Sequence, residues 1–220
     1  MDERFLIIET AHRQGVVAVA LGDRVVGARH LEEARRHARD LVPRAQDLLR
    51  AQGWRARDLT AVVVSRGPGS YTGLRVGLMS AKTLAYATGS KLLGVDTFAA
   101  IALQVPLEAS SVDVLADAQQ DKIYVQRYIK GHGGTLEIQP YAAWLASLPA
   151  GSWVTGPGLE KHAAAIPDDI GQAPRKDWWP RPESLLALAL ARWRGGEHDD
   201  PFTLDALYLR ASSAEEKWRK

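Results

Sequence analysis

The two halves of the chain carry the same order of expected strands and helices, and this repeat limits the fold more than any single motif does. In the first half, three strand-like segments precede a helix, a strand and a second helix, at residues 4–10, 15–21, 25–31, 40–52, 59–65 and 71–87. A further strand at 91–95 and a helix at 97–104 complete this half. The second half repeats the order, with strand patterns at 112–116, 122–129 and 136–138, helical patterns at 141–148 and after Gly158, and a strand at 152–155 between them. This repeat predicts a two-lobed α/β protein in which each lobe is a mixed sheet with helices.

Composition agrees with a folded protein of this kind. Hydrophobic residues make up 46% of the 220 residues and charged residues 25%, which excludes a disordered or coiled-coil chain. Cysteine is absent, so the chain has no disulfides or thiolate chemistry. The uncharged stretch 139–159 is interrupted by proline and glycine, so it cannot form one membrane-spanning helix. We therefore expect a cytoplasmic protein with lobes at 1–108 and 109–220. A C-terminal helix, expected at 182–194, is allowed to pack back on the first lobe.

The sharpest local motif is the glycine-rich loop that runs from Arg66 to Gly73. It follows an apolar strand and opens a helix, where free backbone amides can hold an anion. No Lys-Ser/Thr pair follows the last glycine, so the loop does not match a Walker-type phosphate loop. Its spacing is G-x-G-x-x-x-G, so it does not match the dinucleotide-binding pattern G-x-G-x-x-G either. We favour a tight turn with Ser70 as the helix N-cap over a phosphate site.

The helix behind this loop carries a stripe of small residues, Gly73, Gly77, Ala81 and Ala85, at every fourth position. Each glycine inside a helix costs about 0.5–1 kcal/mol relative to alanine, so two of them indicate a packing reason. Because such a stripe has almost no side-chain atoms, it allows a neighbouring helix to approach closely. That neighbour is either this chain's own helix at 41–52 or a helix of a partner subunit, and the residues alone favour the two equally.

Other patterns with chemical meaning are weak. No two histidines are spaced to share a metal on one helical face, and no G-x-S-x-G nucleophile motif occurs, so we expect no metal site and no catalytic residues. The acids Glu9, Asp96 and Asp117 lie near strand ends. Carboxylates at such positions can bind Mg²⁺, but isolated ones are more often turn or helix-cap residues. Arginines cluster around the first helix. Interleaved aspartates favour an ion-paired, solvated face over nucleic-acid contact.

Several segments resemble the bacterial TsaB (YeaZ) family. The resemblance is carried by Gly67–Gly77, by Ala81-Lys82 and by Gly94–Thr97, with support from Gly156–Leu159 and other segments across most of the chain. It implies an actin-like, Hsp70-like (ASKHA) fold. It also implies a non-catalytic accessory subunit that binds and activates TsaD in threonylcarbamoyl transfer to the adenosine beside the tRNA anticodon. The implied partners are TsaD, the ATPase TsaE, tRNA through the complex, and a second copy of the chain in isolation.

The resemblance also assigns residues. The partner surface of the two first-lobe helices, carried over position by position, comprises His37, Leu41, Ala45, Leu48, Gly73, Leu74, Gly77, Leu78 and Ala81. Residues that could hold ATP or ADP with Mg²⁺ at a composite site are Glu9, Thr10, Asp117, Gly156 and Gly158. Glu9-Thr10-Ala11 departs from the family's usual Asp-Thr-Ser and weakens the nucleotide assignment. The alternatives are a small ATP-binding phosphotransferase of the same fold and, less favoured, a glycoprotease-type peptidase.

Overall fold

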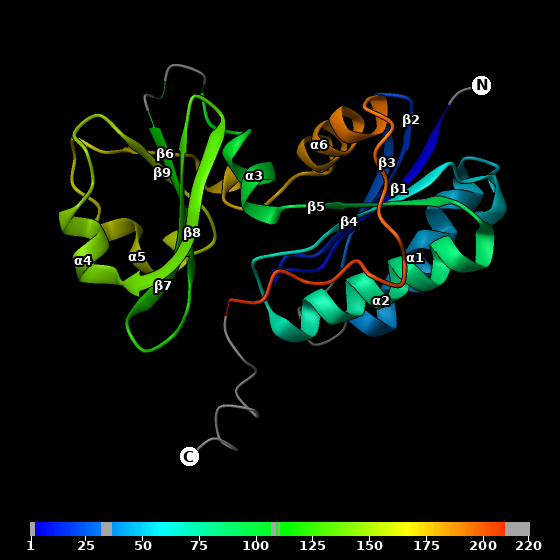
Figure 1. The fold of residues 1–220 in the computed structure, drawn as a ribbon, viewed down its shortest axis with the longest axis horizontal. Coiled ribbons are helices and arrows are strands. Elements are labelled where there is room, and N and C mark those ends of the chain that lie inside the picture. The colour runs from blue at the N-terminus through cyan, green and yellow to red at the C-terminus, as the bar shows by residue number, and fades with distance from the viewer. Residues whose placement is uncertain (1–2, 32–36, 107–108, 110, 210–220) are drawn as a thin grey trace, which may run out of the picture. The chain divides into compact units, whose positions relative to one another are not determined.

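The computed structural model describes residues 3–31, 37–106, 109 and 111–209. The chain forms two compact units, one of Met1–Thr97 with Pro182–Lys220 and one of Phe98–Arg181 (Figure 1). This division differs from the boundary at residue 108 that the sequence predicts. The chain enters the second unit in α3 (Thr97–Ala102), because Phe98 and Ile101 are buried in that unit's core. It returns to the first unit with α6 (Pro182–Arg194).

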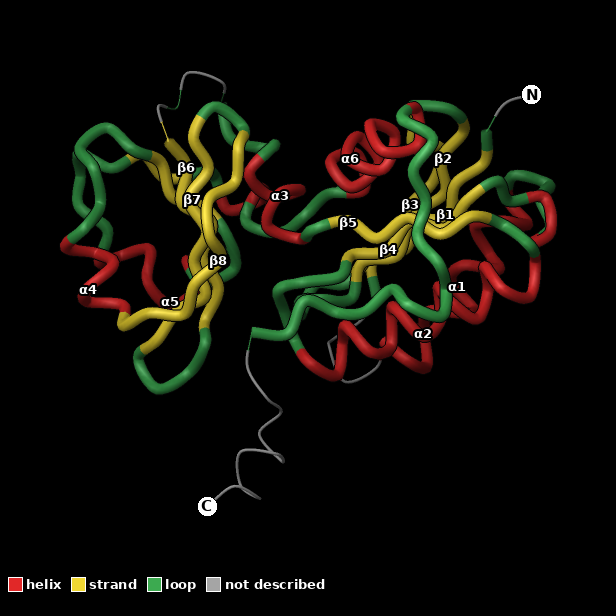
Figure 2. The backbone as a smooth tube through the Cα atoms, in the orientation of Figure 1, coloured by secondary structure: helices red, strands yellow, loops and turns green. Residues whose placement is uncertain are grey.

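The first unit is built on a five-stranded mixed sheet with the order β3-β2-β1-β4-β5 (Figure 2). Its strands are β1 (Arg4–Glu9), β2 (Val16–Leu21), β3 (Arg24–His30), β4 (Ala61–Ser65) and β5 (Lys91–Val95). The central β1 is antiparallel to β2 and parallel to β4. Short connections favour the antiparallel β1–β2–β3 meander, whereas β4 and β5 each follow a helical segment.

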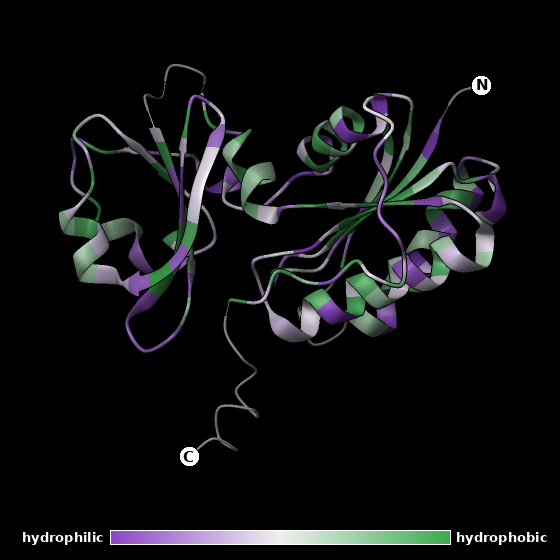
Figure 3. Cartoon of the chain, in the orientation of Figure 1, coloured by the Kyte–Doolittle hydropathy of each residue, from purple (hydrophilic) through white to green (hydrophobic). Residues whose placement is uncertain are grey.

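Two helices cover one face of this sheet and α6 packs on the sheet as well (Figure 1). They are α1 (His37–Ala51), which contains Pro43, and α2 (Tyr71–Thr88); the short helix η2 (Ala56–Asp58) follows α1. Alternate residues of β1 and β4 enter the core beneath α1 and α2, in keeping with the hydrophobic strands in Figure 3. None of the described helices is long and apolar enough to cross a membrane.

The second unit repeats the strand arrangement of the first. Its sheet has the order β10-β9-β6-β7-β8, formed by β6 (Ser111–Asp117), β7 (Lys122–Ile129), β8 (His132–Pro140), β9 (Trp153–Thr155) and β10 (Gly171–Gln172). The central β6 is antiparallel to β7 and parallel to β9, as β1 is to β2 and β4. The helical segments are α4 (Tyr141–Ala146), α5 (Leu159–His162), η3 (Ala163–Ala165) and η4 (Arg175–Asp177). The predicted two-lobed α/β fold with mixed sheets is confirmed.

Candidate functional site

The glycine-rich loop forms a turn and a helix cap, as the sequence predicts. The Ser70 side chain accepts a hydrogen bond from the Gly73 backbone N–H at 3.3 Å, and α2 ends at Gly89, whose φ of 73° is left-handed. Gly67 also has a positive φ, of 113°, and its carbonyl accepts the Thr97 N–H at 2.9 Å. The loop is therefore tied to Thr97 at the start of α3 and to the first turn of α2.

The small-residue stripe of α2 faces the chain's own sheet. A Cβ atom on Gly73 would collide with the Thr10 carbonyl oxygen, and one on Gly77 would collide with the Thr10 hydroxyl. The Thr10 hydroxyl donates a hydrogen bond to the Gly73 carbonyl at 2.8 Å. The stripe thus lets α2 approach the end of β1 rather than another helix.

This packing corrects the predicted partner surface. Its buried members are Leu41, Leu48, Gly73, Leu74, Gly77, Leu78 and Ala81, which contribute to the interior of the first unit. Ala45 is half-buried against the same core, and the side chain of His37 lies outside the described residues. The stripe residues of the predicted partner surface are therefore buried within the first unit, because the apolar periodicity marks the face that meets the sheet.

The same helices carry an exposed face that points away from the sheet. On α2 it consists of Thr72, Arg75, Met79, Thr83 and Tyr86, spaced three or four residues apart. Met79 is 60% and Tyr86 is 71% exposed, and on α1 Val42 is exposed as well. We call these residues the outer face of α1 and α2.

A C-terminal segment, residues 199–208, lies against α2 and adds to its exposed surface. The Lys82 ammonium donates to the Leu204 carbonyl at 2.8 Å, Phe202 packs edge-on against Tyr86 with ring centroids 5.6 Å apart, and Tyr208 lies 4.8 Å from Tyr71. No motif in the sequence indicated this return, because its contacts are single and far apart in sequence.

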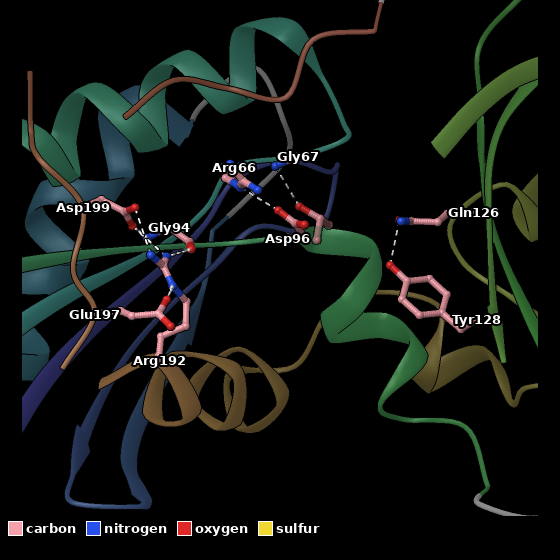
Figure 4. A network of polar contacts seen from close by, with 10 residues as sticks. Arg66, Gly67, Gly94, Asp96, Gln126, Tyr128, Arg192, Glu197 and Asp199 are labelled. Atoms are coloured by element: carbon pink, nitrogen blue, oxygen red, sulfur yellow. Dashed lines mark hydrogen bonds and ion pairs between the residues drawn. The ribbon is translucent and has the colours of Figure 1, made fainter. Parts of the chain in front are cut away.

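An ion-pair network anchors the start of that segment (Figure 4). Arg192 at the end of α6 donates to Asp199 at 2.8 and 3.0 Å and to the Gly94 carbonyl at 2.6 Å. The Gly94 N–H donates to Asp199 at 2.6 Å. Burial opposes ionisation of Asp199, but the bonds from Arg192 and Gly94 outweigh it and lower the Asp199 pKa.

Two of the predicted nucleotide residues, Glu9 and Thr10, are buried at the end of β1. A Glu9 carboxylate oxygen accepts the Ala11 N–H at 2.5 Å, and burial raises the Glu9 pKa to about 7. Burial also lowers the pKa of the neighbouring His12 to about 4. Near neutral pH this end of β1 therefore carries less charge than its residue types suggest.

The other three belong to the second unit. Asp117 is exposed; its carboxylate accepts the Gln119 N–H at 3.1 Å and lies 3.8 Å from the Lys161 ammonium. Gly156 and Gly158 pack closely on Leu115. The composite nucleotide site stays a prediction. Among the described residues, no group of three or more acidic or histidine side chains is arranged to hold a metal ion.

The arginines near α1 include ion pairs of the kind that the solvated-face interpretation predicts. Arg39 lies 2.7 Å from Asp40, and Arg55 lies 3.4 Å from Asp58. Bonds from the Arg55 backbone and side chain lower the pKa of Asp58. Arg35 and Arg36 lie outside the described residues.

Sequence reasoning missed a polar centre inside the second unit. Asp113 on β6 is only 1% exposed, and it accepts hydrogen bonds from Arg127 at 2.6 and 2.8 Å and from the Trp144 indole at 2.8 Å. The available signal was an aspartate inside the apolar segment Val112–Leu115, a position that needs a buried partner.

Comparisons with known proteins place the chain among tRNA-modification proteins. Residues 30–165 match the family model described as TsaD, tRNA N6-adenosine threonylcarbamoyltransferase. The chain is 28% identical to the tRNA threonylcarbamoyladenosine biosynthesis protein TsaB of Escherichia coli, over 99% of this chain and 97% of that protein.

Solved structures agree with this relationship. YeaZ from Pseudomonas aeruginosa is 25% identical and superimposes with a TM-score of 0.79, covering 94% of this chain and all of that one. The activator of the 2-hydroxyisocaproyl-CoA dehydratase from Clostridium difficile, solved with bound ADPNP, is 10% identical and shares the fold at a TM-score of 0.51, covering 89% of this chain and 95% of that one. Together with the two repeated sheets, these matches show that the chain belongs to the TsaB (YeaZ) family.

Proposed function

We propose that the chain is a non-catalytic accessory subunit in tRNA threonylcarbamoyladenosine biosynthesis. In this proposal it binds a TsaD-type transferase and activates threonylcarbamoyl transfer to adenosine, while a TsaE-type ATPase and the tRNA join through the complex. Full-length similarity to a protein named for this pathway is the observation that carries the proposal. The match of residues 30–165 to the TsaD family model supports a transferase of related fold as the partner.

The outer face of α1 and α2 is the surface that we propose for this partner. Val42, Met79 and Tyr86 expose large apolar side chains there. The helices beneath them are held rigidly by the buried face of α2, so little order is lost when a partner binds. Two such helix layers packed together could bury about 1,200–2,000 Å² in total. The same surface would support a homodimer when the partner is absent.

The decisive experiment charges this face and leaves the core intact. In Val42→Asp/Met79→Asp, each aspartate replaces an exposed side chain, so the fold is retained. We expect affinity for the TsaD-type partner to fall by about 100-fold or more, because two desolvated carboxylates oppose association. Modification of tRNA by the reconstituted complex should fall in parallel.

The matched control is Ile129→Asp, which charges an equally exposed apolar residue in the second unit. It should bind and activate the partner normally. Unchanged affinity in the α1–α2 double variant would move the partner surface elsewhere. Normal affinity without activation would separate binding from the proposed activating role.

Nucleotide binding is a second, narrower proposal. The fold neighbour solved with ADPNP supports it, with ATP or ADP and Mg²⁺ held by Glu9, Thr10, Asp117, Gly156 and Gly158 once the complex has assembled. The buried, backbone-bonded Glu9 carboxyl counts against tight binding by the chain alone. Calorimetry with ATP and Mg²⁺ tests this on the isolated chain and on the complex. Binding by the chain alone would favour the phosphotransferase alternative, and heat from neither sample would remove both.

A further inference from the structure

A cavity in the second unit lies among residues that the proposed function does not use. Its volume is about 330 Å³. Val125 and Arg127 alternate along β7, Glu137 and Gln139 alternate along β8, and Val125 pairs with Glu137, so these side chains share one face of the sheet. Thr135 also lines the cavity, at the shift in register between the two strands. The lining is mostly charged and polar, with Val125 as its one apolar side chain, so a ligand here would be recognised through charge and hydrogen bonds.

Arg127 supplies a rigid group of hydrogen-bond donors to this cavity. Its Nε and Nη2 atoms donate to Asp113 at 2.6 and 2.8 Å, whereas Nη1 has no partner among the described residues. The guanidinium side chain is 34% exposed, and Asp113 is held in turn by the Trp144 indole. A guanidinium oriented in this way favours a carboxylate ligand, whose oxygens match its planar donors.

Glu137 supplies the opposite charge across the cavity. It lies opposite Val125 in the β7–β8 ladder, and within the described part of the chain its carboxylate makes no ion pair. Side chains at diagonal positions of an antiparallel pair are roughly 7–8 Å apart, so Glu137 and Arg127 can contact the two ends of a small molecule. The buried Val125, opposite Glu137 and two residues before Arg127 on β7, is the apolar neighbour of both.

The charge balance selects the kind of ligand. Asp113 neutralises Arg127, and Glu137 adds a further negative charge, so a simple anion is disfavoured. An ammonium group on the same molecule compensates Glu137 and leaves the carboxylate for Arg127.

We propose that this cavity binds a zwitterionic α-amino acid. Its carboxylate contacts Arg127, its ammonium contacts Glu137, and its carbon atoms rest on Val125. Thr135 and Ser147 line the same cavity; the Ser147 hydroxyl already donates to the Trp144 carbonyl at 2.8 Å, so it can only accept a hydrogen bond from the ligand. This inference does not depend on the proposed function, because the cavity and the outer face of α1 and α2 belong to different units.

The test is a titration of the isotopically labelled full chain, followed by the NMR signals of its backbone amides. The probes are unmodified L-α-amino acids, each added to about 10 mM, which detects affinities down to the millimolar range. At least one should shift the signals of residues 125–127 and 135–139 in a saturable manner. The N-acetyl and methyl ester derivatives of that amino acid should each bind at least tenfold more weakly, since each lacks one charge.

Glu137→Gln preserves the size of an exposed side chain and removes its charge, so the variant should fold normally and bind the amino acid at least tenfold more weakly. Glu160→Gln, an exposed change elsewhere in the second unit, is the matched control and should bind as the unaltered chain does. The proposal is overturned if no amino acid shifts these signals, if the methyl ester binds as well as its parent, or if Glu137→Gln leaves affinity unchanged. The titration contains no partner protein, so a failure of the partner surface proposed on α1 and α2 would be a separate result.

Discussion

The two units have the same strand order but differ in what covers their sheets. β3-β2-β1-β4-β5 of the first unit corresponds to β8-β7-β6-β9-β10 of the second. The paired strands β4 and β5 have five residues each, whereas β9 has three and β10 two. The helix after β4 has 18 residues, and the helix after β9 has four. Among the residues that the structure describes, only those of the first unit form a layer of long helices, which is why the partner surface is proposed there.

The units also hold their helices by different physical means. In the first, Gly73 and Gly77 bring α2 against Thr10 by omitting side chains. In the second, Trp144 of α4 fills the core and bonds to the buried Asp113. The packing of α2 on its sheet therefore depends on the absence of side chains, whereas that of α4 depends on a buried charge. This difference can be tested by mutation.

We expect the largest loss of stability when the contacts of Asp113 with Arg127 and Trp144 are disrupted. Arg127→Leu leaves Asp113 buried without its cation, and we expect it to lower the free energy of unfolding by about 3–5 kcal/mol in a urea titration. Adding Asp113→Asn should recover most of this loss. Lys130→Leu, an exposed change on the same hairpin, is the control and should alter stability little. A loss below about 1 kcal/mol would mean that Asp113 is solvated once Arg127 is gone.

The next effect disrupts the shape-dependent contact. Gly77→Leu forces a side chain into Thr10 and displaces its bond to the Gly73 carbonyl, so we expect a loss of about 3 kcal/mol in unfolding free energy. Met79→Leu, on the outer side of the same helix, should change stability by less than about 0.5 kcal/mol. If Gly77→Leu instead left stability intact and blocked partner binding, the glycine stripe would face the partner after all.

These two contacts show where sequence reasoning worked and where it stopped. The repeated strand order and the Ser70 cap were predictable, because each rests on local periodicity or on the conformation of one residue. The direction of the Gly73–Gly77 stripe was not, since periodicity identifies a face of a helix without identifying its neighbour. Those glycines meet Thr10, a strand-end residue more than 60 positions away.

Long-range pairing explains the other failures. Asp113 stands out in an apolar segment, but nothing local points to Arg127 or Trp144 as its partners. The boundary at residue 108 was placed from a change in composition, whereas the core contacts of Phe98 place the division before α3. The return of α6 to the first unit agrees with the packing that the sequence left open for the C-terminal helix.

A smaller effect concerns Glu9 and His12, two buried groups at the end of β1 whose titrations make the stability of the fold depend on pH in opposite directions. Glu9 has its pKa raised from 4.5 to about 7, so it contributes stability that is lost as pH rises from 4.5 to 7. His12 has its pKa lowered from 6.5 to about 4, so its contribution is lost as pH falls over that range. Between pH 4.5 and 6.5 the two slopes cancel.

Single variants should reveal each slope. Glu9→Gln should make stability fall on acidification from pH 6.5 to 4.5, by on the order of 2 kcal/mol in total, and His12→Gln should make it rise by a similar amount. Urea midpoints measured at several pH values give both signs. Identical pH profiles in the two variants would show that neither group titrates in the folded chain as its burial requires.

We expect the smallest loss of stability from removing an exposed ion pair, which can be compared with a buried pair of equal length. Arg66–Asp96 in the first unit and Arg127–Asp113 in the second both have an N–O distance of 2.6 Å. Arg66 and Asp96 are 39% and 37% exposed, so water and salt screen their attraction. Arg66→Leu should therefore cost less than about 1 kcal/mol, and that cost should shrink further in high salt, unlike the cost of Arg127→Leu. A salt-independent loss as large as that of Arg127→Leu would mean that pair length, rather than burial, sets the contribution of these ion pairs, and the contrast drawn between the two units would fail.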